Sequence, residues 1–224
     1  AALLRAAGAA RIAGTARLLP GPGAVPRLCV GSATIPADAV VAAAGAWAPA
    51  LLAPLLAPLG LALQVAPQRG QIAHLQLPGA ETAAWPVILP PGTHYMLGFP
   101  GGRVVAGATR ESGSGFDHRR TAGGAHAVLH EALAIAPGLA AATLLGLRVG
   151  FRPLAPDGRP LLGRAPAWPG LVIGNGLGPN GITIGPLAGR LLAALALGEE
   201  PEFDLAPYDP FRAFGPGDES ALMR

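Results

Sequence analysis

The sequence predicts a fold of the α/β plus α+β class, in which an α/β domain is interrupted by an inserted domain built on an antiparallel sheet. Short apolar strand and helix patterns occur at both ends of the chain. Between them, the strands carry polar residues among the apolar ones, and turns rich in proline and glycine separate these strands. We expect four segments: residues 1–63 and 151–198 in the α/β domain, 64–150 in the antiparallel domain, and 199–224 as a C-terminal tail.

The first α/β segment is expected to contain small elements separated by glycine and proline turns. They are the end of a helix over 1–10, strands over 11–19 and 26–30, a strand of small residues over 35–45, and a helix over 50–56.

The middle segment shows the pattern of an antiparallel meander: polar residues such as Gln71, His74 and Gln76 are interleaved with apolar ones, and Pro/Gly turns separate the strands. We expect strands over 65–77, 87–89, 94–98, 103–108 and 144–151, and a helix over 121–136 that stops at Pro137. The chain then returns to α/β character with a buried strand over 171–174 and a helix over 182–197. The tail after Pro201 has no periodicity and is expected to lie on the surface.

Composition excludes several functional classes. The net charge of +3 comes from scattered arginines without a basic run among aromatic residues, so we expect no nucleic-acid partner. The single cysteine, Cys29, excludes an internal disulfide and a cysteine-based zinc site, and we expect no metal. Residues 39–68 carry no charge, but repeated prolines interrupt them, so we expect no transmembrane segment. No signal peptide is visible, and we expect a cytoplasmic protein.

A glycine loop precedes the last helix. Residues Gly176–Gly181 match the G-x-G-x-x-G pattern, with Glu199 and Glu200 further along the chain. We reject a nicotinamide dinucleotide site, because no apolar strand follows the helix after residue 198. The helix N-terminus favours an electron-rich ring or a phosphate, and glycines allow a flat ligand to approach the backbone. A tight strand–helix connection without a ligand explains the loop equally well.

Arg152 lies in a rigid setting bounded by prolines. Its planar guanidinium suits bidentate binding of a carboxylate. The alternative is a structural arginine that pairs with Asp157, and taken alone this alternative is favoured.

Five segments, in order along the chain, resemble the FAD-dependent D-amino-acid oxidase superfamily, especially its glycine oxidase and D-amino-acid dehydrogenase branch. The segments are Ala37–Trp47 with its Gly-Ala-Trp end, Pro67–Ile72 with Arg-Gly-Gln, Tyr95 with the hairpin Gly102–Thr109, Gly150–Gly163 around Arg152, and the closing strand, glycine loop and helix.

The resemblance implies an FAD-dependent oxidoreductase that transfers hydride from the α-carbon of a small amino acid or secondary amine to the flavin. Arg152 would bind the substrate carboxylate, and Tyr95 would assist through its hydroxyl. No side chain is expected to act as a catalytic acid or base. The residues expected at the flavin are Ala44, Gly45, Trp47, Gly176, Leu177, Gly178, Asn180, Gly181 and Ile182.

The glycine fingerprint that holds the FAD pyrophosphate in this superfamily is absent from the sequence. We therefore expect the chain to be the C-terminal portion of such an enzyme, to need an N-terminal FAD-binding segment or subunit, and to bind FAD weakly or not at all when it is isolated. The alternative is a truncated, non-catalytic fragment or subunit.

Overall fold

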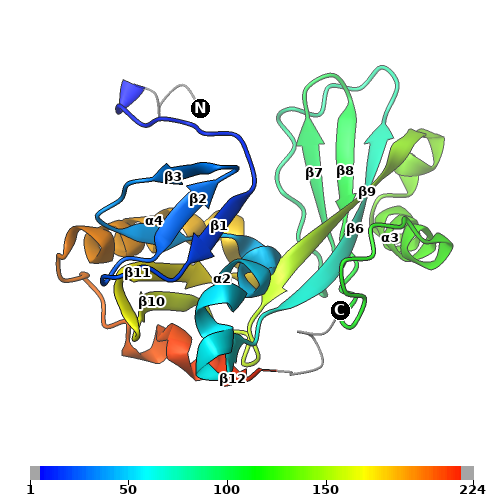
Figure 1. Cartoon of the computed structure of the whole chain (residues 1–224). Helices are drawn as coiled ribbons and strands as arrows, with labels where there is room; N and C mark the ends of the chain where they lie inside the picture. The colour runs from blue at the N-terminus through cyan, green and yellow to red at the C-terminus, as the bar shows by residue number, and fades with distance from the viewer. Residues whose placement is uncertain (1–5, 218–224) are drawn as a thin grey trace. The chain divides into compact units, whose positions relative to one another are not determined.

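A computed structural model describes residues 6–217 of the chain, which divide into two compact units (Figure 1). The inserted unit is Ala66–Leu154, and the flanking unit comprises the described residues before and after it. The chain thus leaves the flanking unit after Val65 and returns to it at Ala155. Each unit has its own apolar core, the physical criterion of a domain.

The flanking unit contains three small sheets. The pairing is antiparallel except where β4 runs parallel to β11. The sheets are β1 (Ala16–Leu19), β2 (Arg27–Val30) and β3 (Ala33–Ile35); β10 (Leu161–Ala165), β11 (Trp168–Asn175) and β4 (Val40–Ala42); and β12 (Phe214–Pro216) with β5 (Leu61–Leu63). Short 3-10 helices join them: η1 (Gly45–Trp47), η2 (Ala57–Leu59), η4 (Gly178–Asn180), η5 (Ala206–Tyr208) and η6 (Pro210–Ala213).

Two α-helices of the flanking unit cover these strands. In α2 (Ala48–Leu56), Leu52 and Leu55 are each 1% exposed and join the main core. In α4 (Gly181–Leu197), Leu191 and Leu192 pack with Val172 of β11. Gly198 ends α4 in the left-handed conformation, with a φ of 79°, where glycine has no steric penalty.

Helix α4 with the turn before it, Gly178–Leu197, has the length and apolar composition of a membrane span, and 17% of its most apolar window is buried. The same test is passed by core helices of water-soluble proteins, so it does not assign α4 to a membrane. The leucine contacts with β11 account for one of its faces.

The inserted unit is a four-stranded antiparallel sheet with a helix on one face (Figure 1). The strand order is β7 (Tyr95–Phe99), β8 (Arg103–Gly107), β6 (Ala66–Gln76) and β9 (Thr143–Leu154). Helix α3 (Ala122–Ile135) is capped by the Thr121 hydroxyl and is followed by η3 (Pro137–Ala141). We call the side that packs against it the α3 face, and the other side the opposite face.

Side-chain alternation assigns the residues of β6 to these two faces. Ala73 and Leu75 pack with Val128 of α3 in the apolar core, so Arg69 and Gln71 also belong to the α3 face. The residues between them point to the opposite face, namely Gly70, Ile72, His74 and Gln76.

Three expectations from the sequence are wrong in detail. Residues 87–89 form only one bridge, between Ile88 and Met96, because the prolines on both sides remove amide donors. The strand expected over 35–45 is interrupted between β3 and β4. The tail is not a bare surface segment: β12 pairs with β5, and Ala213 is only 2% exposed. Of the helix expected over 1–10, residues 1–5 lie outside the described part.

Candidate functional site

The two segments expected at the flavin are neighbours within the flanking unit. Strands β4 and β11 run parallel, so their carboxyl ends lie at the same edge of the sheet. Ala44, Gly45 and Trp47 follow β4, and the loop of Gly176, Leu177, Gly178, Asn180, Gly181 and Ile182 follows β11.

Asn175 joins the two segments and was not identified from the sequence. It is 2% exposed, its Nδ2 donates to the Gly45 carbonyl at 2.9 Å, and its Oδ1 accepts from the Gly176 amide at 2.7 Å. A buried amide that meets partners on both sides fixes the two turns against each other. The local sequence showed only an amide side chain at the end of a buried strand. Its role could not be predicted, because the Gly45 carbonyl that it contacts lies 130 residues away in the sequence.

The loop leaves bare backbone open to a ligand. Gly45 and Gly178 have φ values of 56° and 54°, and a Cβ on either would meet nothing within 4 Å. Gly176, with a φ of 66°, serves packing instead, because a Cβ there would lie 3.0 Å from the Cβ of Ala155. These glycines therefore create a surface that a planar group can approach closely.

Charge and exposure around the loop also suit a planar, electron-rich ligand. The side chain of Asn180 makes no capping hydrogen bond at the start of α4, so the first amides of the helix lack a side-chain acceptor. Trp47 is 51% exposed and Ile182 is 96% exposed, which provides apolar surface next to these amides. The alternative of a closed connection without a ligand explains neither exposure.

Arg152 lies on β9 in the inserted unit, opposite Gln68 of β6. Its guanidinium lies over Gly70, where a Cβ would be 2.6 Å from Nη1, and Nη1 donates to the Thr109 carbonyl at 3.1 Å. No carboxylate among residues 6–217 forms an ion pair with it.

Asp157, the residue considered as a structural partner of Arg152, is paired within the flanking unit. Asp157 pairs with Arg159 and with Arg212, each at 2.8 Å. Hydrogen bonds from Arg212 and from the Arg159 amide and side chain hold the pKa of Asp157 well below its usual range. Asp157 therefore already has cationic partners of its own unit.

Burial lowers the pKa of the Arg152 guanidinium, the nearby Tyr95 opposes this effect, and Arg110 adds to it. An arginine side chain remains a cation at neutral pH even so. A partly desolvated cation without a fixed counter-ion binds an incoming carboxylate more strongly than a solvated one does.

Tyr95 shares a cavity with Arg152. Its ring lies over Gly107, whose hypothetical Cβ would be 3.2 Å from the Tyr95 hydroxyl oxygen. The cavity has a volume of about 370 Å³. It is lined by Gly70, Ile72, Tyr95, Arg148, Val149, Gly150, Phe151 and Arg152. The structure thus brings the two expected substrate-binding residues together.

A polar network on the α3 face supports this cavity. Arg69, 8% exposed, pairs with Glu111 at 2.5 Å and with Asp117 at 2.7 Å. Gln71 is fully buried; its Nε2 donates to Glu111 at 2.8 Å, and its amide donates to the Thr109 hydroxyl at 2.9 Å. The network fixes the residue whose carbonyl holds Arg152.

The ionised form of Glu111 is favoured within that network. Burial acts to raise the pKa of Glu111, but hydrogen bonds from Thr109, Gln71 and Arg69, with the charge of Arg69, lower it overall. Arg69 and Gln71 were matched from the sequence only as part of a motif. Their partners lie about forty residues further along the chain, so the network could not be predicted from the neighbouring sequence.

Histidines and metals contribute no further site among residues 6–217. No group of three or more His, Cys, Asp and Glu side chains is placed to hold a metal ion. The Nε2 atoms of His74 and His94 are buried without a hydrogen-bond partner. Cys29 is buried in β2.

The architecture defines a class of protein: an α/β unit interrupted by an inserted unit built on an antiparallel sheet. The family profile described as "FAD dependent oxidoreductase" (DAO) matches residues 1–195. The chain therefore belongs to the DAO family of FAD-dependent oxidoreductases.

Individual relatives agree with this assignment. "Uncharacterized oxidoreductase YurR" of Bacillus subtilis is 48% identical over 204 residues, which is 91% of this chain and 54% of that protein. "Glycine oxidase" of Geobacillus kaustophilus is 37% identical over 182 residues, which is 81% of this chain and 46% of that protein. The crystal structure of iminodiacetate oxidase from Chelativorans sp. BNC1 has a TM-score of 0.86 at 48% identity, covering 93% of this chain and 56% of that one.

These comparisons confirm the mixed α/β class with antiparallel sheets and the resemblance to the glycine oxidase and D-amino-acid dehydrogenase branch. The chain spans about half the length of the curated relatives that it matches. The residues present fit one part of FAD, because open glycines, exposed apolar side chains and uncapped helix amides suit its planar, electron-rich ring.

Proposed function

We propose that the protein containing this chain is an FAD-dependent oxidoreductase that oxidises a small amino acid or secondary amine at its CH–NH2 or CH–NH group. The observation that carries the proposal is Arg152, a partly buried cation without a carboxylate partner in the described chain, in a cavity shared with Tyr95. Membership of the DAO family supplies the redox class.

In this proposal, Arg152 binds the substrate carboxylate through its planar guanidinium and sets the orientation of the α-carbon. The Thr109 carbonyl accepts a hydrogen bond from one guanidinium nitrogen and so limits the rotation of the side chain. The Tyr95 hydroxyl is available to a second polar atom of the substrate. No described His, Asp or Glu lines the cavity, so these side chains bind and orient rather than carry protons.

The cofactor would be held, in the part that this chain supplies, by the turns after β4 and β11. Gly45 and Gly178 give close access, Trp47 and Ile182 give apolar contact, and the first amides of α4 favour negative charge. When bound, FAD supplies the hydride acceptor: the substrate C–H bond breaks, the amine becomes an imine, and water hydrolyses the imine to a carbonyl compound and ammonia or an amine.

The names of the relatives suggest the range of substrates. Glycine has one carboxylate, whereas iminodiacetate, the substrate named for the Chelativorans protein, has two on a secondary amine. Both contain the amine and the adjacent carboxylate that the Arg152 cavity would receive. The partners proposed are such a substrate and an N-terminal FAD-binding segment, and the compartment proposed is the cytoplasm.

Replacing Arg152 by glutamine tests the function. We expect kcat/KM for amino acids to fall on the order of 100-fold, chiefly through KM, because a desolvated carboxylate pair is lost. Arg27→Gln is the control, since Arg27 is an exposed arginine of β2. An unchanged KM in the Arg152 variant removes this residue from the site.

The second candidate is a non-catalytic fragment or subunit that takes up FAD only together with an N-terminal partner. Flavin content separates the candidates. A chain purified with one FAD per molecule rejects the second candidate, whereas a chain that takes up FAD only with an N-terminal partner supports it.

A further inference from the structure

A second arginine on β9 faces the same cavity as Arg152. Leu147 packs against the core beneath the sheet, so alternation places its neighbour Arg148 on the opposite face. Arg152, four residues further along the strand, lies on that face as well. Like Arg152, Arg148 forms no ion pair with any carboxylate among residues 6–217.

Cross-strand pairing places bare backbone between the two arginines. Arg148 lies opposite Ile72, Arg152 lies opposite Gln68, and the row between them pairs Gly150 with Gly70. A Cβ on Gly150 would meet nothing within 4 Å, so the space above Gly150 is open, whereas the Arg152 guanidinium extends over Gly70. The two arginines therefore lie at the two ends of a floor of glycine backbone.

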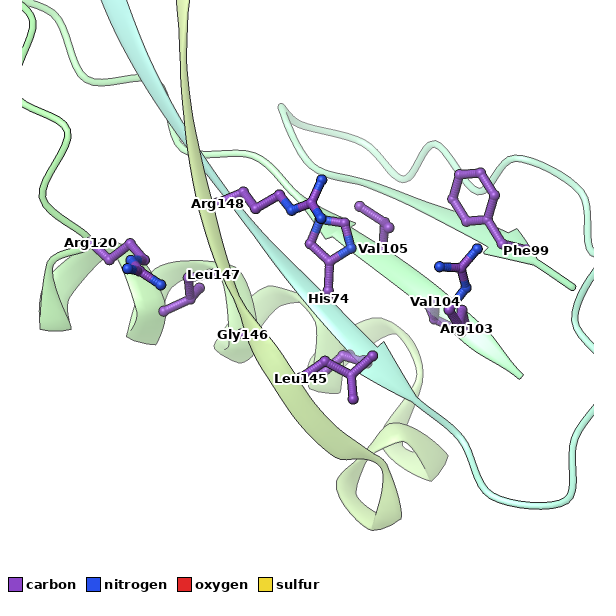
Figure 2. Close-up of a pocket in the computed structure, with 11 residues that line it drawn as sticks. His74, Phe99, Arg103, Val104, Val105, Arg120, Leu145, Gly146, Leu147 and Arg148 are labelled. Carbon is purple, nitrogen blue, oxygen red and sulfur yellow. The ribbon is translucent and has the colours of Figure 1, made fainter. Parts of the chain in front are cut away.

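The surroundings of Arg148 contain further positive charge, which favours the binding of an anion there. A second cavity, of about 510 Å³, includes Arg148 together with His74 and Arg103, and Figure 2 shows these three side chains on the same side of the sheet. Neither cavity is lined by an aspartate or a glutamate. The field along this face is thus positive without a compensating charge from the described lining.

The two arginines line the same cavity of about 370 Å³, so one ligand can meet both cations. Their Cα atoms are about 13 Å apart, because an extended strand rises about 3.3 Å per residue, and both have long side chains. A CH2–NH–CH2 link, which separates two carboxylate carbons by about 5 Å, suits two guanidinium groups that reach into one cavity.

We propose that the substrate is an amine bearing two carboxylates, of which Arg152 binds the one beside the reacting carbon and Arg148 binds the other. This inference rests on the proposed function, since it assigns the substrate class of the same site. Arg148 is then a specificity-determining residue, because a substrate with one carboxylate leaves it without a partner.

The test compares two substrates that differ only in the distal group: iminodiacetate and N-ethylglycine, in which a methyl group replaces the second carboxylate. In the holoenzyme, Arg148→Gln is expected to lower the ratio of kcat/KM for iminodiacetate to kcat/KM for N-ethylglycine about tenfold, the effect of losing a charged hydrogen bond. Arg148→Lys should retain part of the ratio.

Arg103→Gln is the matched control, because Arg103 also lies on this face but does not line the cavity of Arg152. It should leave the ratio unchanged. A ratio that Arg148→Gln does not change, or that Arg103→Gln lowers equally, overturns the proposal. Arg148 is exposed, so its variants are expected to fold.

Calorimetry separates this inference from the proposed function, because it requires no turnover. Glutarate has the same spacing of carboxylates as iminodiacetate, and pentanoate lacks the second one. Tighter binding of glutarate that Arg148→Gln abolishes supports the inference even if no amine is oxidised, a result that rejects the proposed function alone. Equal binding of the two acids overturns the inference even in an active amine oxidase.

Discussion

The two faces of the inserted sheet use the same residue type in opposite ways. On the α3 face, the guanidinium of Arg69 is held by two carboxylates, Glu111 and Asp117. On the opposite face, Arg152 has one backbone carbonyl as its hydrogen-bond acceptor and no carboxylate in the described chain. Arg69 lies on the inner strand β6 and Arg152 on the edge strand β9, and the two side chains are largely and partly buried respectively.

A structural arginine thus differs from a ligand-binding one in the number of hydrogen-bond acceptors that the chain provides to its guanidinium. Burial and residue type do not separate the two. A buried cation whose partners are all within the chain stabilises that chain and has little capacity for a ligand. A buried cation that lacks them is available for a ligand. The following variants test whether the two faces differ in this way.

Gln71→Leu should have the largest effect, and it concerns stability. The change removes the hydrogen bonds that a fully buried side chain donates to Glu111 and to the Thr121 hydroxyl and accepts from the Thr121 amide, and it places an apolar group among these polar atoms. We expect the free energy of unfolding to fall by about 3 kcal/mol, measured by chemical denaturation.

Gln68→Leu provides the comparison, because Gln68 bonds only to the exposed Ser112 at 3.2 Å. Its cost should stay within about 0.5 kcal/mol. If both variants lose the same stability, the α3-face network is not the structural element described here.

Gly70→Ala should affect binding more than folding. The added methyl group would meet the guanidinium of Arg152 at 2.6–2.9 Å, and a flexible side chain can move away at little cost. We expect KM for the substrate to rise about tenfold, with the unfolding midpoint nearly unchanged, because Arg152 loses its position over the strand.

Gly138→Ala is the control for Gly70→Ala, since a Cβ at Gly138 meets nothing within 4 Å. Steady-state kinetics and thermal unfolding of the two variants decide between the roles. A large loss of stability in Gly70→Ala with an unchanged KM would assign Gly70 to packing rather than to the site.

The smallest effect concerns pH. Burial lowers the pKa of His74, and the charges of Arg148 and Arg103 lower it further, so the folded state favours the neutral ring. Below the ordinary histidine pKa of about 6.5, the unfolded chain binds a proton that the folded chain does not. Stability should therefore fall as the pH drops from 7.5 through 6.5 and below.

His74→Gln should flatten this part of the stability profile, measured by denaturation at several pH values. The α3 face responds in a different window. The pKa of Glu111 is lowered in the folded state, so its contribution is present above the ordinary carboxyl pKa and is lost in acid as the pH falls through the folded value. An identical slope near pH 6 in the wild type and in His74→Gln would contradict the assignment.

Local patterns in the sequence predicted the long elements. The interleaving of Gln71, His74 and Gln76 with apolar residues predicts the strand that the structure shows as β6, and Gly198 marks the end of α4. The motifs also predicted which residues to examine. Tyr95 and Arg152 share one cavity, and the turns after β4 and β11 are adjacent. Their assigned roles stay predictions until they are tested.

Features that depend on distant partners could not be predicted. The Asn175 side chain donates a hydrogen bond to a carbonyl 130 residues away. The carboxylate of Asp157 accepts a hydrogen bond from Arg212, 55 residues further along the chain. Strand β12 has three residues, too few for a periodic signal, and exists because β5 offers an edge. In each case, the physical cause is a contact that only the folded chain creates.

The pairing of β6 with β9 has a consequence for engineering and for evolution. Ala66, the first residue of the inserted unit, is the register partner of Leu154, its last. Paired residues on adjacent strands lie about 5 Å apart, so a tight turn could connect Val65 to Ala155 directly. The inserted unit can therefore be exchanged as one piece without redesign of the turns proposed to hold the flavin, and such an exchange tests whether substrate preference follows this unit.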